Sequence, residues 1–244
     1  MRIAVIGAGI SGLVAAYQLR DVAEVHLFEA NNYLGGHTNT VDVDEGPTKL
    51  AVDTGFIVFN DRTYPNFCRL IDRLGVEWQS TDMSFGFMDD ISGLEYAAPS
   101  LRGIFAQARR ITDQDHWRML RDIPRFNKHA QKVLGNGHAP RDLGEVFDSG
   151  EVGAAVRDRY IVPMLSAIWS ADRSDVREMP AIPFLRFMQN HGLLSLFQQP
   201  TWRVIKGGSR NYVQPLVKES RATVHLGSPV RTIRRSQDSV AVET

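Results

Sequence analysis

The first thirty residues place short apolar runs on either side of a glycine cluster. The apolar runs are Ile3–Ile6 and Val25–Phe28, each of a length typical of a buried strand. The glycine cluster, Gly7 to Gly12, follows the first run directly, and apolar residues at helical spacing come after it. This pattern predicts a strand, a tight turn, a helix that begins near Ser11, and a second strand that ends at Glu29.

Further along the chain, alternating apolar and polar positions predict strands, and apolar positions three or four apart predict helices. The predicted strands are Thr40–Asp44, residues 50–59 as a buried strand interrupted by a turn, a hairpin over Met83–Ala98, Trp202–Ile205, Thr223–Leu226, Val230–Arg234 and residues 240–244. The predicted helices are Tyr64–Leu74, Leu101–Leu134, Leu143–Phe147, Gly153–Tyr160, Met164–Trp169, Pro183–Asn190 and Asn211–Glu219. The segment Gly135-Asn136-Gly137 is predicted to end the longest helical stretch.

The order of these elements predicts an α/β fold with three segments. Residues 1–82 form the first part of a Rossmann-like nucleotide-binding domain with a parallel sheet. Residues 83–200 form a mixed, largely helical domain that interrupts it, and residues 201–244 return to the first domain. The return is expected to be incomplete, because the last strand stops in mid-pattern at Thr244.

Charge is balanced overall but unevenly distributed. Lys plus Arg number 28 and Asp plus Glu number 28, so the net charge is zero and nothing indicates a nucleic-acid partner. Residues 101–141, however, hold nine Lys or Arg and three Asp or Glu. A helix here would carry Arg102, Arg109 and Arg110 beside apolar residues. We expect an exposed amphipathic helix, with peripheral membrane contact as the alternative.

The cysteine and histidine patterns exclude several kinds of site. Cys68 is the single cysteine, so no intrachain disulfide or thiolate zinc site forms, and its helical context indicates a buried thiol. The seven histidines show no paired spacing typical of a metal site. No run approaches the roughly 18 apolar residues of a membrane span. No leader precedes the glycine motif, so we expect a cytoplasmic protein.

The glycine cluster has the chemistry of a site for the ADP half of a dinucleotide. Gly7 permits the tight turn, Gly9 lets the backbone approach a pyrophosphate, and Gly12 lets helix and strand pack closely. The helix that begins near Ser11 directs its free N–H groups at the phosphates. Glu29 can accept hydrogen bonds from the ribose hydroxyls and would repel a 2′-phosphate, which favours FAD or NAD over NADP.

A second glycine pair follows the ribose acid and indicates a flavoprotein. The sequence continues Gly35-Gly36-His37-Thr38 and later Asp53-Thr54-Gly55. With these motifs the chain resembles the superfamily of flavin amine oxidases, phytoene desaturases and protoporphyrinogen oxidases. The segments VDTGFIVFNDRTYPN, AIWSA, FMQNHGLL and WRVIKGGSRNYV resemble a group of bacterial predicted NAD/FAD-binding oxidoreductases. His37 departs from this pattern, since the superfamily usually has arginine there, and imidazole lacks the charged fork of guanidinium.

The resemblance implies FAD as the cofactor and assigns its contacts. The implied cofactor-binding residues are Gly7, Ala8, Gly9, Ser11, Gly12, Glu29, Ala30, Gly35, Gly36, His37, Thr38, Gly55, Phe56 and Val230. Of these, residues 35–38 would line the flavin side, Gly55 and Phe56 the isoalloxazine edge, and Val230, on a strand, the adenine. The superfamily's later Gly-Asp segment does not occur, so we expect a C-terminally truncated chain with two of three FAD-contacting segments and weak FAD binding.

The implied activity is an FAD-dependent oxidation in which a hydride passes from a hydrophobic substrate, at an amine C–N or a C–C bond, to flavin N5. Candidate cavity-lining residues are Trp169, Asn190, His191 and Trp202, and the apolar content around Phe184 and Phe197 favours a small hydrophobic substrate. No catalytic acid or base is identified. Two alternatives remain open: a non-catalytic nucleotide-binding protein and an NAD-dependent dehydrogenase.

Overall fold

A computed structural model describes residues 1–98, 100–135, 139–169, 171–195 and 200–244. The chain forms two units, one made of Met1–Thr81 with Thr201–Thr244 and the other of Asp82–Pro200. Asn136 and Gly137, which were predicted to end a helix, and the apolar Phe197 lie outside the described residues.

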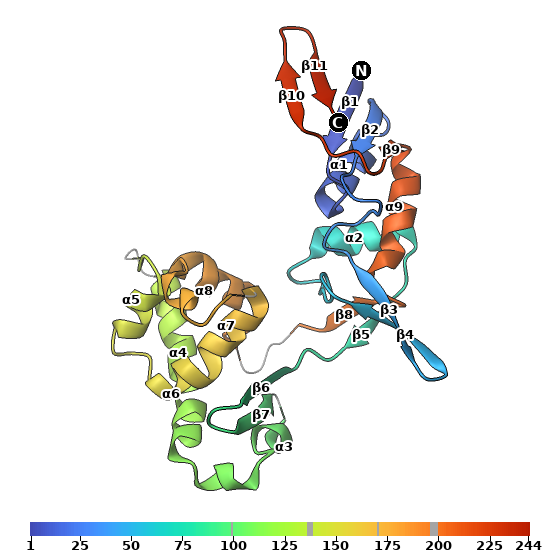
Figure 1. Cartoon of the computed structure of the whole chain (residues 1–244). Helices are drawn as coiled ribbons and strands as arrows, with labels where there is room; N and C mark the ends of the chain where they lie inside the picture. The colour runs from blue at the N-terminus through green and yellow to red at the C-terminus, as the bar shows by residue number, and fades with distance from the viewer. Residues whose placement is uncertain (99, 136–138, 170, 196–199) are drawn as a thin grey trace. The chain divides into compact units, whose positions relative to one another are not determined.

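The first unit is built on a three-stranded parallel sheet. Its strands are β1 (Arg2–Ile6), β2 (Glu24–Phe28) and β9 (Thr223–His225), in the order β1-β2-β9 (Figure 1). Helix α1 (Ile10–Leu19) packs on it, and α9 (Val213–Ser220) packs beside α1. The buried side chains of Leu13, Leu27 and Leu216 join α1, β2 and α9 in one apolar cluster. The predicted α/β fold with a parallel sheet is therefore confirmed.

The rest of the first unit surrounds this core with short elements. These are β3 (Thr40–Glu45), β4 (Thr48–Asp53), α2 (Pro65–Leu74), β5 (Trp78–Thr81), β8 (Trp202–Ile205), a 3-10 turn η4 (Ser209–Tyr212), β10 (Thr232–Arg235) and β11 (Val240–Glu243). Helix α2 begins at Pro65, whose missing N–H costs nothing at a first helical position. It ends at Gly75, which adopts the left-handed conformation with φ 64°.

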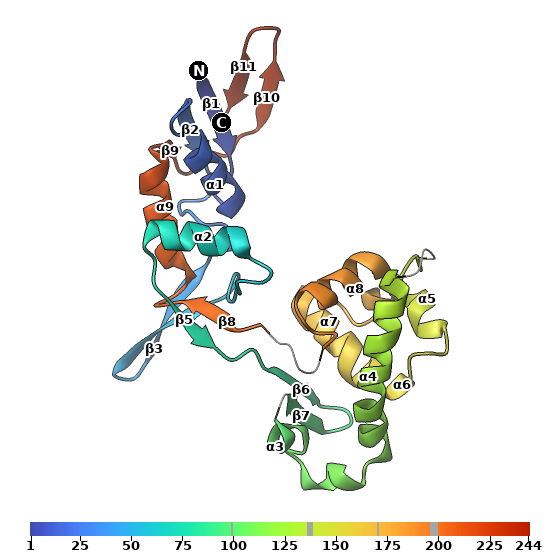
Figure 2. The same ribbon diagram turned by 180° about the vertical axis from the view of Figure 1, so that it is seen from behind.

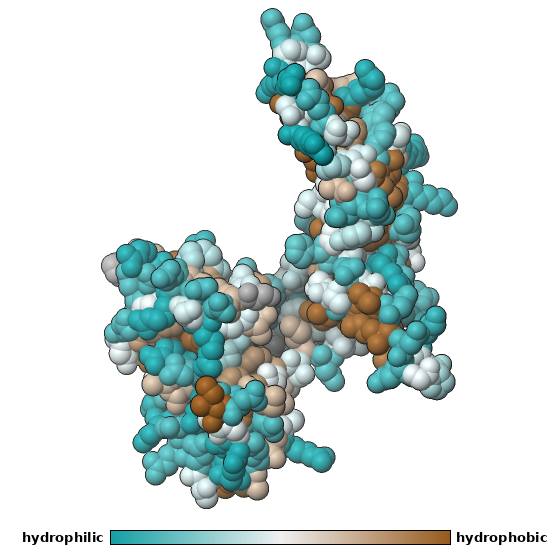
Figure 3. All heavy atoms as spheres, in the orientation of Figure 1, coloured by the Kyte–Doolittle hydropathy of each residue, from teal (hydrophilic) through white to brown (hydrophobic). Residues whose placement is uncertain are grey.

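Residues 50–59 do not form the buried strand expected from their apolar content. Strand β4 ends at Asp53 and pairs only with β3, as an exposed hairpin. Val41, Val43, Leu50 and Val52 share one face of this hairpin, and each is 41–44% exposed. Figure 3 shows the hydrophobic surface that gathers over the hairpin. The sequence correctly indicated an apolar face, but among the described residues no other element packs over it.

The second unit is a helical bundle with one hairpin. Its elements are β6 (Phe85–Asp89), β7 (Leu94–Ala98), α3 (Leu101–Ile104), η1 (Ala108–Thr112), α4 (Gln114–Gly135), α5 (Leu143–Asp148), α6 (Ala154–Val156), a π-helical turn η2 (Arg157–Ile161), α7 (Val162–Trp169), η3 (Asp175–Glu178) and α8 (Ala181–Asn190). Figure 2 shows α4 beside α8 and the β6–β7 hairpin beside α3. Fully buried Phe126, Leu165 and Leu185 lie in its core.

The helix predicted over residues 101–134 is three separate pieces. Asp113 accepts hydrogen bonds from the backbone N–H groups of Asp115 and His116, and so begins α4 at a new point. Arg110 is only 9% exposed, donates to the carbonyl of Gly93 and pairs with Asp113 at 2.9 Å. Because Arg110 is bonded to the hairpin and the predicted helix is broken, Arg102, Arg109 and Arg110 do not share one stripe along a helix. The described residues do not support the alternative of peripheral membrane contact.

No helix among the described residues has the length and apolar content needed to cross a bilayer. The cytoplasmic location stays a prediction.

Candidate functional site

The glycine turn between β1 and α1 has the geometry that its sequence predicts. Gly7 has φ +91°, and its N–H donates to the carbonyl of Phe28 at 2.7 Å. A Cβ on Gly12 would lie 1.9 Å from the carbonyl oxygen of Gly7, so only glycine fits there. Helix α1 begins after Gly9 without a side-chain cap. Its first-turn N–H groups have no acceptor within the helix and are directed to one spot, which suits an anion.

Gly9 faces open space. No atom lies within 4 Å of the position that a Cβ on Gly9 would occupy. The backbone is thus free for close approach by a ligand, as the sequence predicts for a pyrophosphate. Ser11 is exposed on the first turn of α1, and buried Ala8 lies between Gly7 and Gly9. The turn therefore presents backbone N–H groups and small residues to a ligand the size of a phosphate.

Glu29 stands at the end of β2 and organises the turn. It is only 7% exposed, and its carboxylate accepts hydrogen bonds from the backbone N–H of Ala8 at 2.7 Å and from Asn31, through N–H at 2.9 Å and Nδ2 at 3.0 Å. Burial opposes ionisation of Glu29, but the hydrogen bonds from Asn31 and Ala8 outweigh it and lower its pKa. The carboxylate has about four acceptor positions, three of which these donors use. Room remains for about one ribose hydroxyl.

A turn that sequence reasoning missed joins Glu29 on its other side. The N–H of Glu29 donates to the carbonyl of His225 at 2.9 Å, and the N–H of Ser228 donates to the carbonyl of Glu29 at 2.8 Å. The N–H of Gly227 donates to the carbonyl of Asn31 at 3.0 Å. Gly227, which follows the predicted strand Thr223–Leu226, was a sequence signal for a turn. The residues that this turn contacts, Glu29 and Asn31, lie almost two hundred positions earlier in the chain. Exposed Ala30 lies between these two anchored positions.

The second glycine pair, Gly35-Gly36, lies directly against the first glycine cluster, Gly7 to Gly12. The N–H of Gly35 donates to the carbonyl of Ala8 at 2.8 Å, and Gly9 and Gly35 form a parallel bridge. Gly36 has φ +60°, and a Cβ on it would lie 3.1 Å from Cα of Gly9. The two glycine loops, predicted separately, are therefore parts of one site.

The loop that follows is fastened to the segment around Gly55. The N–H of Phe56 donates to the carbonyl of His37 at 2.8 Å, and a Cβ on Gly55 would lie 2.0 Å from that oxygen. The side chain of His37 is exposed, whereas Thr38 is buried and hydrogen-bonds to the hydroxyl of Tyr212. Half-buried Phe56 packs edge-on against Phe67, with ring centroids 5.1 Å apart. The structure thus brings together the predicted residues from Gly7 to Phe56.

Asp53 and Ser209 form an anchor that the sequence did not reveal. Asp53 accepts hydrogen bonds from the backbone N–H of Ser209 at 2.9 Å, from its Oγ at 2.8 Å and from Oγ1 of Thr40 at 2.6 Å. Ser209 is fully buried. These contacts join the start of the residue 53–56 segment to η4 and to β3.

Replacing Asp53 with asparagine is expected to lower the free energy of unfolding by about 1–3 kcal/mol, because an amide NH₂ cannot accept the bonds that the carboxylate takes. Urea denaturation measures this loss. The matched control is Asp44→Asn on the same hairpin, whose side chain is 77% exposed and which should leave stability unchanged. Equal effects of the two substitutions would contradict the anchoring role.

The remaining predicted site residues do not all lie in contact with one another. Val230 was expected on a strand but precedes β10 by two residues, because the strand pairing begins at Thr232. Trp169 and His191 both contact Phe187 in the second unit, at ring-centroid distances of 4.6 Å and 3.8 Å. Asn190 is exposed, and Trp202 is buried in the first unit. The described contacts therefore link Trp169 and His191 alone among the predicted cavity residues.

The residues present fit the ADP part of a dinucleotide. An uncapped helix N-terminus, an open space over Gly9 and a buried acid beside the turn are the features that a pyrophosphate and a ribose require.

Comparison with known proteins assigns the family. The chain is 25% identical to a flavin-dependent L-tryptophan oxidase of Lentzea aerocolonigenes, over 99% of this chain and 54% of that protein. It is 31% identical over 141 residues to a hydroxysqualene dehydroxylase of Sinorhizobium fredii, over 54% of this chain and 33% of that protein.

Solved structures agree on the fold. Cyclohexylamine oxidase from Brevibacterium oxydans aligns with a TM-score of 0.69 and 20% identity, over 98% of this chain and 53% of that one. The chain thus spans about half the length of the tryptophan oxidase and of the cyclohexylamine oxidase. The sequence pattern of the flavin containing amine oxidoreductases matches residues 10–244. The resemblance seen in the glycine motifs is confirmed, and the chain belongs to the flavin containing amine oxidoreductase family.

Proposed function

We propose that the first unit binds the ADP part of FAD at its paired glycine loops. The single observation that carries this proposal is the contact of the two loops, Gly9 with Gly35, at the uncapped start of α1. The N–H groups of this turn would hold the pyrophosphate, and Glu29 would accept one ribose hydroxyl. Gly35 to Thr38, with Gly55 and Phe56, would line the flavin side of the dinucleotide.

The proposed reaction is oxidation of a small hydrophobic substrate at a C–N or C–C bond. FAD, when bound, supplies the acceptor for a hydride at N5. The chain's own residues bind and orient FAD and the substrate, and they exclude water from the site. Phe56, which directly follows Gly55, forms an aromatic cluster with Tyr64 and Phe67. This cluster supports an apolar wall on that side of the site. Relatives named as oxidases of tryptophan and cyclohexylamine support this class of substrate.

Ligand competition tests the site. We expect ADP to bind the full chain and to displace FAD, because the described contacts serve the ADP half. Adenosine 5′-diphosphate 2′-phosphate, which differs from ADP only in its 2′-phosphate, should bind at least about tenfold more weakly, since that phosphate would approach the ionised Glu29. Calorimetry measures both affinities. Absence of ADP binding, or equal affinity for the 2′-phosphorylated ADP, would contradict the proposal.

A flavin-reduction assay separates the oxidoreductase from a non-catalytic nucleotide binder. We expect the visible absorbance of bound FAD to bleach when an amine or another hydrophobic substrate is added without oxygen. Binding of FAD with no bleaching by any substrate class would favour the non-catalytic alternative.

A further inference from the structure

The two oxygens of the Glu29 carboxylate have different partners. Oε1 accepts two hydrogen bonds from one residue, Asn31, through its backbone N–H at 2.9 Å and its side-chain Nδ2 at 3.0 Å. Oε2 accepts one hydrogen bond, from the backbone N–H of Ala8 at 2.7 Å. Each oxygen of a carboxylate has about two acceptor positions. Within the described part of the chain, these donors therefore fill both positions of Oε1 and leave one position of Oε2 open.

The backbone of Asn31 is bonded on both of its sides. Its N–H donates to Oε1 of Glu29, and its carbonyl accepts a hydrogen bond from the N–H of Gly227 at 3.0 Å. Gly227 has φ +58°, a conformation that glycine adopts without strain and that lets the turn after β9 reach Asn31. Because both backbone groups of Asn31 are bonded, its short side chain stays within reach of Oε1.

The open acceptor position lies on the oxygen that faces the glycine turn. Oε2 is bonded to Ala8, which belongs to the turn whose N–H groups we assign to the pyrophosphate. In ADP the 3′-hydroxyl is closer to the 5′-diphosphate along the sugar ring than the 2′-hydroxyl is. A ribose whose diphosphate lies over Gly9 therefore brings its 3′-hydroxyl to Oε2. Its 2′-hydroxyl then faces Oε1, which Asn31 has already filled.

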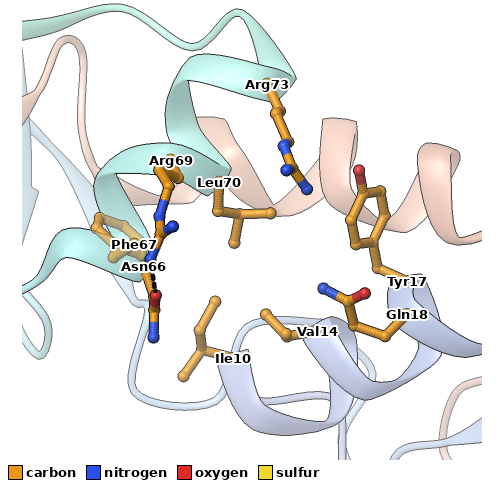
Figure 4. A pocket seen from close by; sticks show the side chains of 9 residues that line it. All are labelled: Ile10, Val14, Tyr17, Gln18, Asn66, Phe67, Arg69, Leu70 and Arg73. Atoms are coloured by element: carbon orange, nitrogen blue, oxygen red, sulfur yellow. Dashed lines mark hydrogen bonds between the residues drawn. The ribbon is translucent and has the colours of Figure 1, made fainter.

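The groove between α1 and α2 is less suited to a ribose. Its volume is about 510 Å³, and Figure 4 shows Ile10 and Val14 of α1 facing Leu70 of α2 across it. Its rim carries the exposed side chains of Arg69 and Arg73. None of its nine lining residues, all of which are described, is acidic. A ribose hydroxyl would meet no carboxylate there, so the acid beside the glycine turn is the better partner.

We propose that Asn31 is a specificity-determining residue of the nucleotide site, because by filling Oε1 it limits Glu29 to a single ribose contact, with the 3′-hydroxyl. The site recognises the adenosine ribose through that hydroxyl and forms no hydrogen bond to the 2′-hydroxyl. This inference rests on the proposed binding of the ADP part of FAD. A 2′-phosphate is still disfavoured, since its charge would lie near the carboxylate.

Deoxynucleotides test which hydroxyl is bound. Calorimetry with the full chain should show that 2′-deoxy-ADP binds as tightly as ADP. The isomer 3′-deoxy-ADP should bind about tenfold more weakly, because it lacks the hydroxyl that donates to a charged group.

Asn31→Ala tests the role of the side chain. The substitution removes the donor Nδ2 and opens one position of Oε1, where the 2′-hydroxyl should then bind. In this variant we expect 2′-deoxy-ADP to bind about five- to tenfold more weakly than ADP, a difference that a merely structural role of Asn31 would not produce. The matched control is Asn32→Ala, since Asn32 is also exposed and its side chain is not among these donors to Glu29. It should keep the pattern of the unsubstituted chain.

The possible results separate this inference from the proposed function. Circular dichroism checks that both variants are folded. Absence of ADP binding to the unsubstituted chain would overturn the proposed function and this inference together. If ADP binds, three results would overturn the role of Asn31 alone: weaker binding of 2′-deoxy-ADP to the unsubstituted chain, equal affinity of that chain for 3′-deoxy-ADP and ADP, or an Asn31→Ala variant that binds 2′-deoxy-ADP as tightly as ADP.

Discussion

Gly12→Ala is expected to destabilise the protein and abolish ADP binding together, whereas Gly9→Ala should abolish ADP binding alone. A Cβ on Gly12 would lie 1.9 Å from the backbone oxygen of Gly7, so α1 and the turn must separate. The cost is about 1–3 kcal/mol, typical of an overpacked core. A Cβ on Gly9 meets no atom within 4 Å, so the fold should accept alanine there. The added methyl would then occupy the space that we assign to the pyrophosphate.

Thermal unfolding and calorimetry with ADP measure the two effects separately. The matched control is Gly86→Ala, because a Cβ on Gly86 also meets no atom within 4 Å and the residue lies in the second unit. It should change neither stability nor affinity. If Gly9→Ala bound ADP as tightly as the unsubstituted chain, the pyrophosphate would not lie over Gly9.

Glu29→Gln is expected to lower both the free energy of unfolding and the affinity for ADP. Glutamine offers one acceptor oxygen, and its NH₂ would face a donor, either the N–H of Ala8 or the two donors of Asn31. We expect a loss of about 2–3 kcal/mol, because these bonds are made to a charged and nearly buried group. Glu219→Gln, at an exposed position on α9, is the control and should have little effect.

The same carboxylate predicts how stability depends on pH. The pKa of Glu29 is lower in the folded protein than its ordinary value. Its contribution to stability is therefore complete above the ordinary carboxyl range and is lost as the pH falls through the lower folded-state pKa. Urea unfolding from about pH 7 to about pH 3 should show a smaller loss for Glu29→Gln than for the unsubstituted chain. Parallel curves would exclude Glu29 as a source of this dependence.

Much of the first unit could be predicted from local patterns. The strand, glycine turn, helix and second strand over residues 2–28 were predictable because each depends on neighbours in sequence. Helix α2, at Pro65–Leu74, agrees with the predicted Tyr64–Leu74 to within one residue, since proline favours a first helical turn. The β6–β7 hairpin also lies within its predicted range.

Two of the wrong predictions have a common cause. The apolar residues around Leu50 suggested burial, but the hairpin that contains them has no covering layer among the described residues. The helical period over residues 101–134 continued across breaks, because side chains of Arg110 and Asp113 form contacts that periodicity does not register. In both segments the residue types correctly showed which positions are apolar or charged. The structure that formed depended on which residues, distant in sequence, those side chains contact.

The sequence by itself determined the elements of the glycine motif, the acid at the end of β2 and the family to which the chain belongs, because these depend on residue types at short spacing. Only the tertiary structure decided that the loop at Gly35 lies on Gly9, that the turn at Ser228 holds Glu29 and that Ser209 anchors Asp53. It also decided that α1 and α2 leave an apolar groove with a cationic rim. The physical reason is that these features join segments up to about two hundred residues apart, and such contacts form only when the whole unit packs.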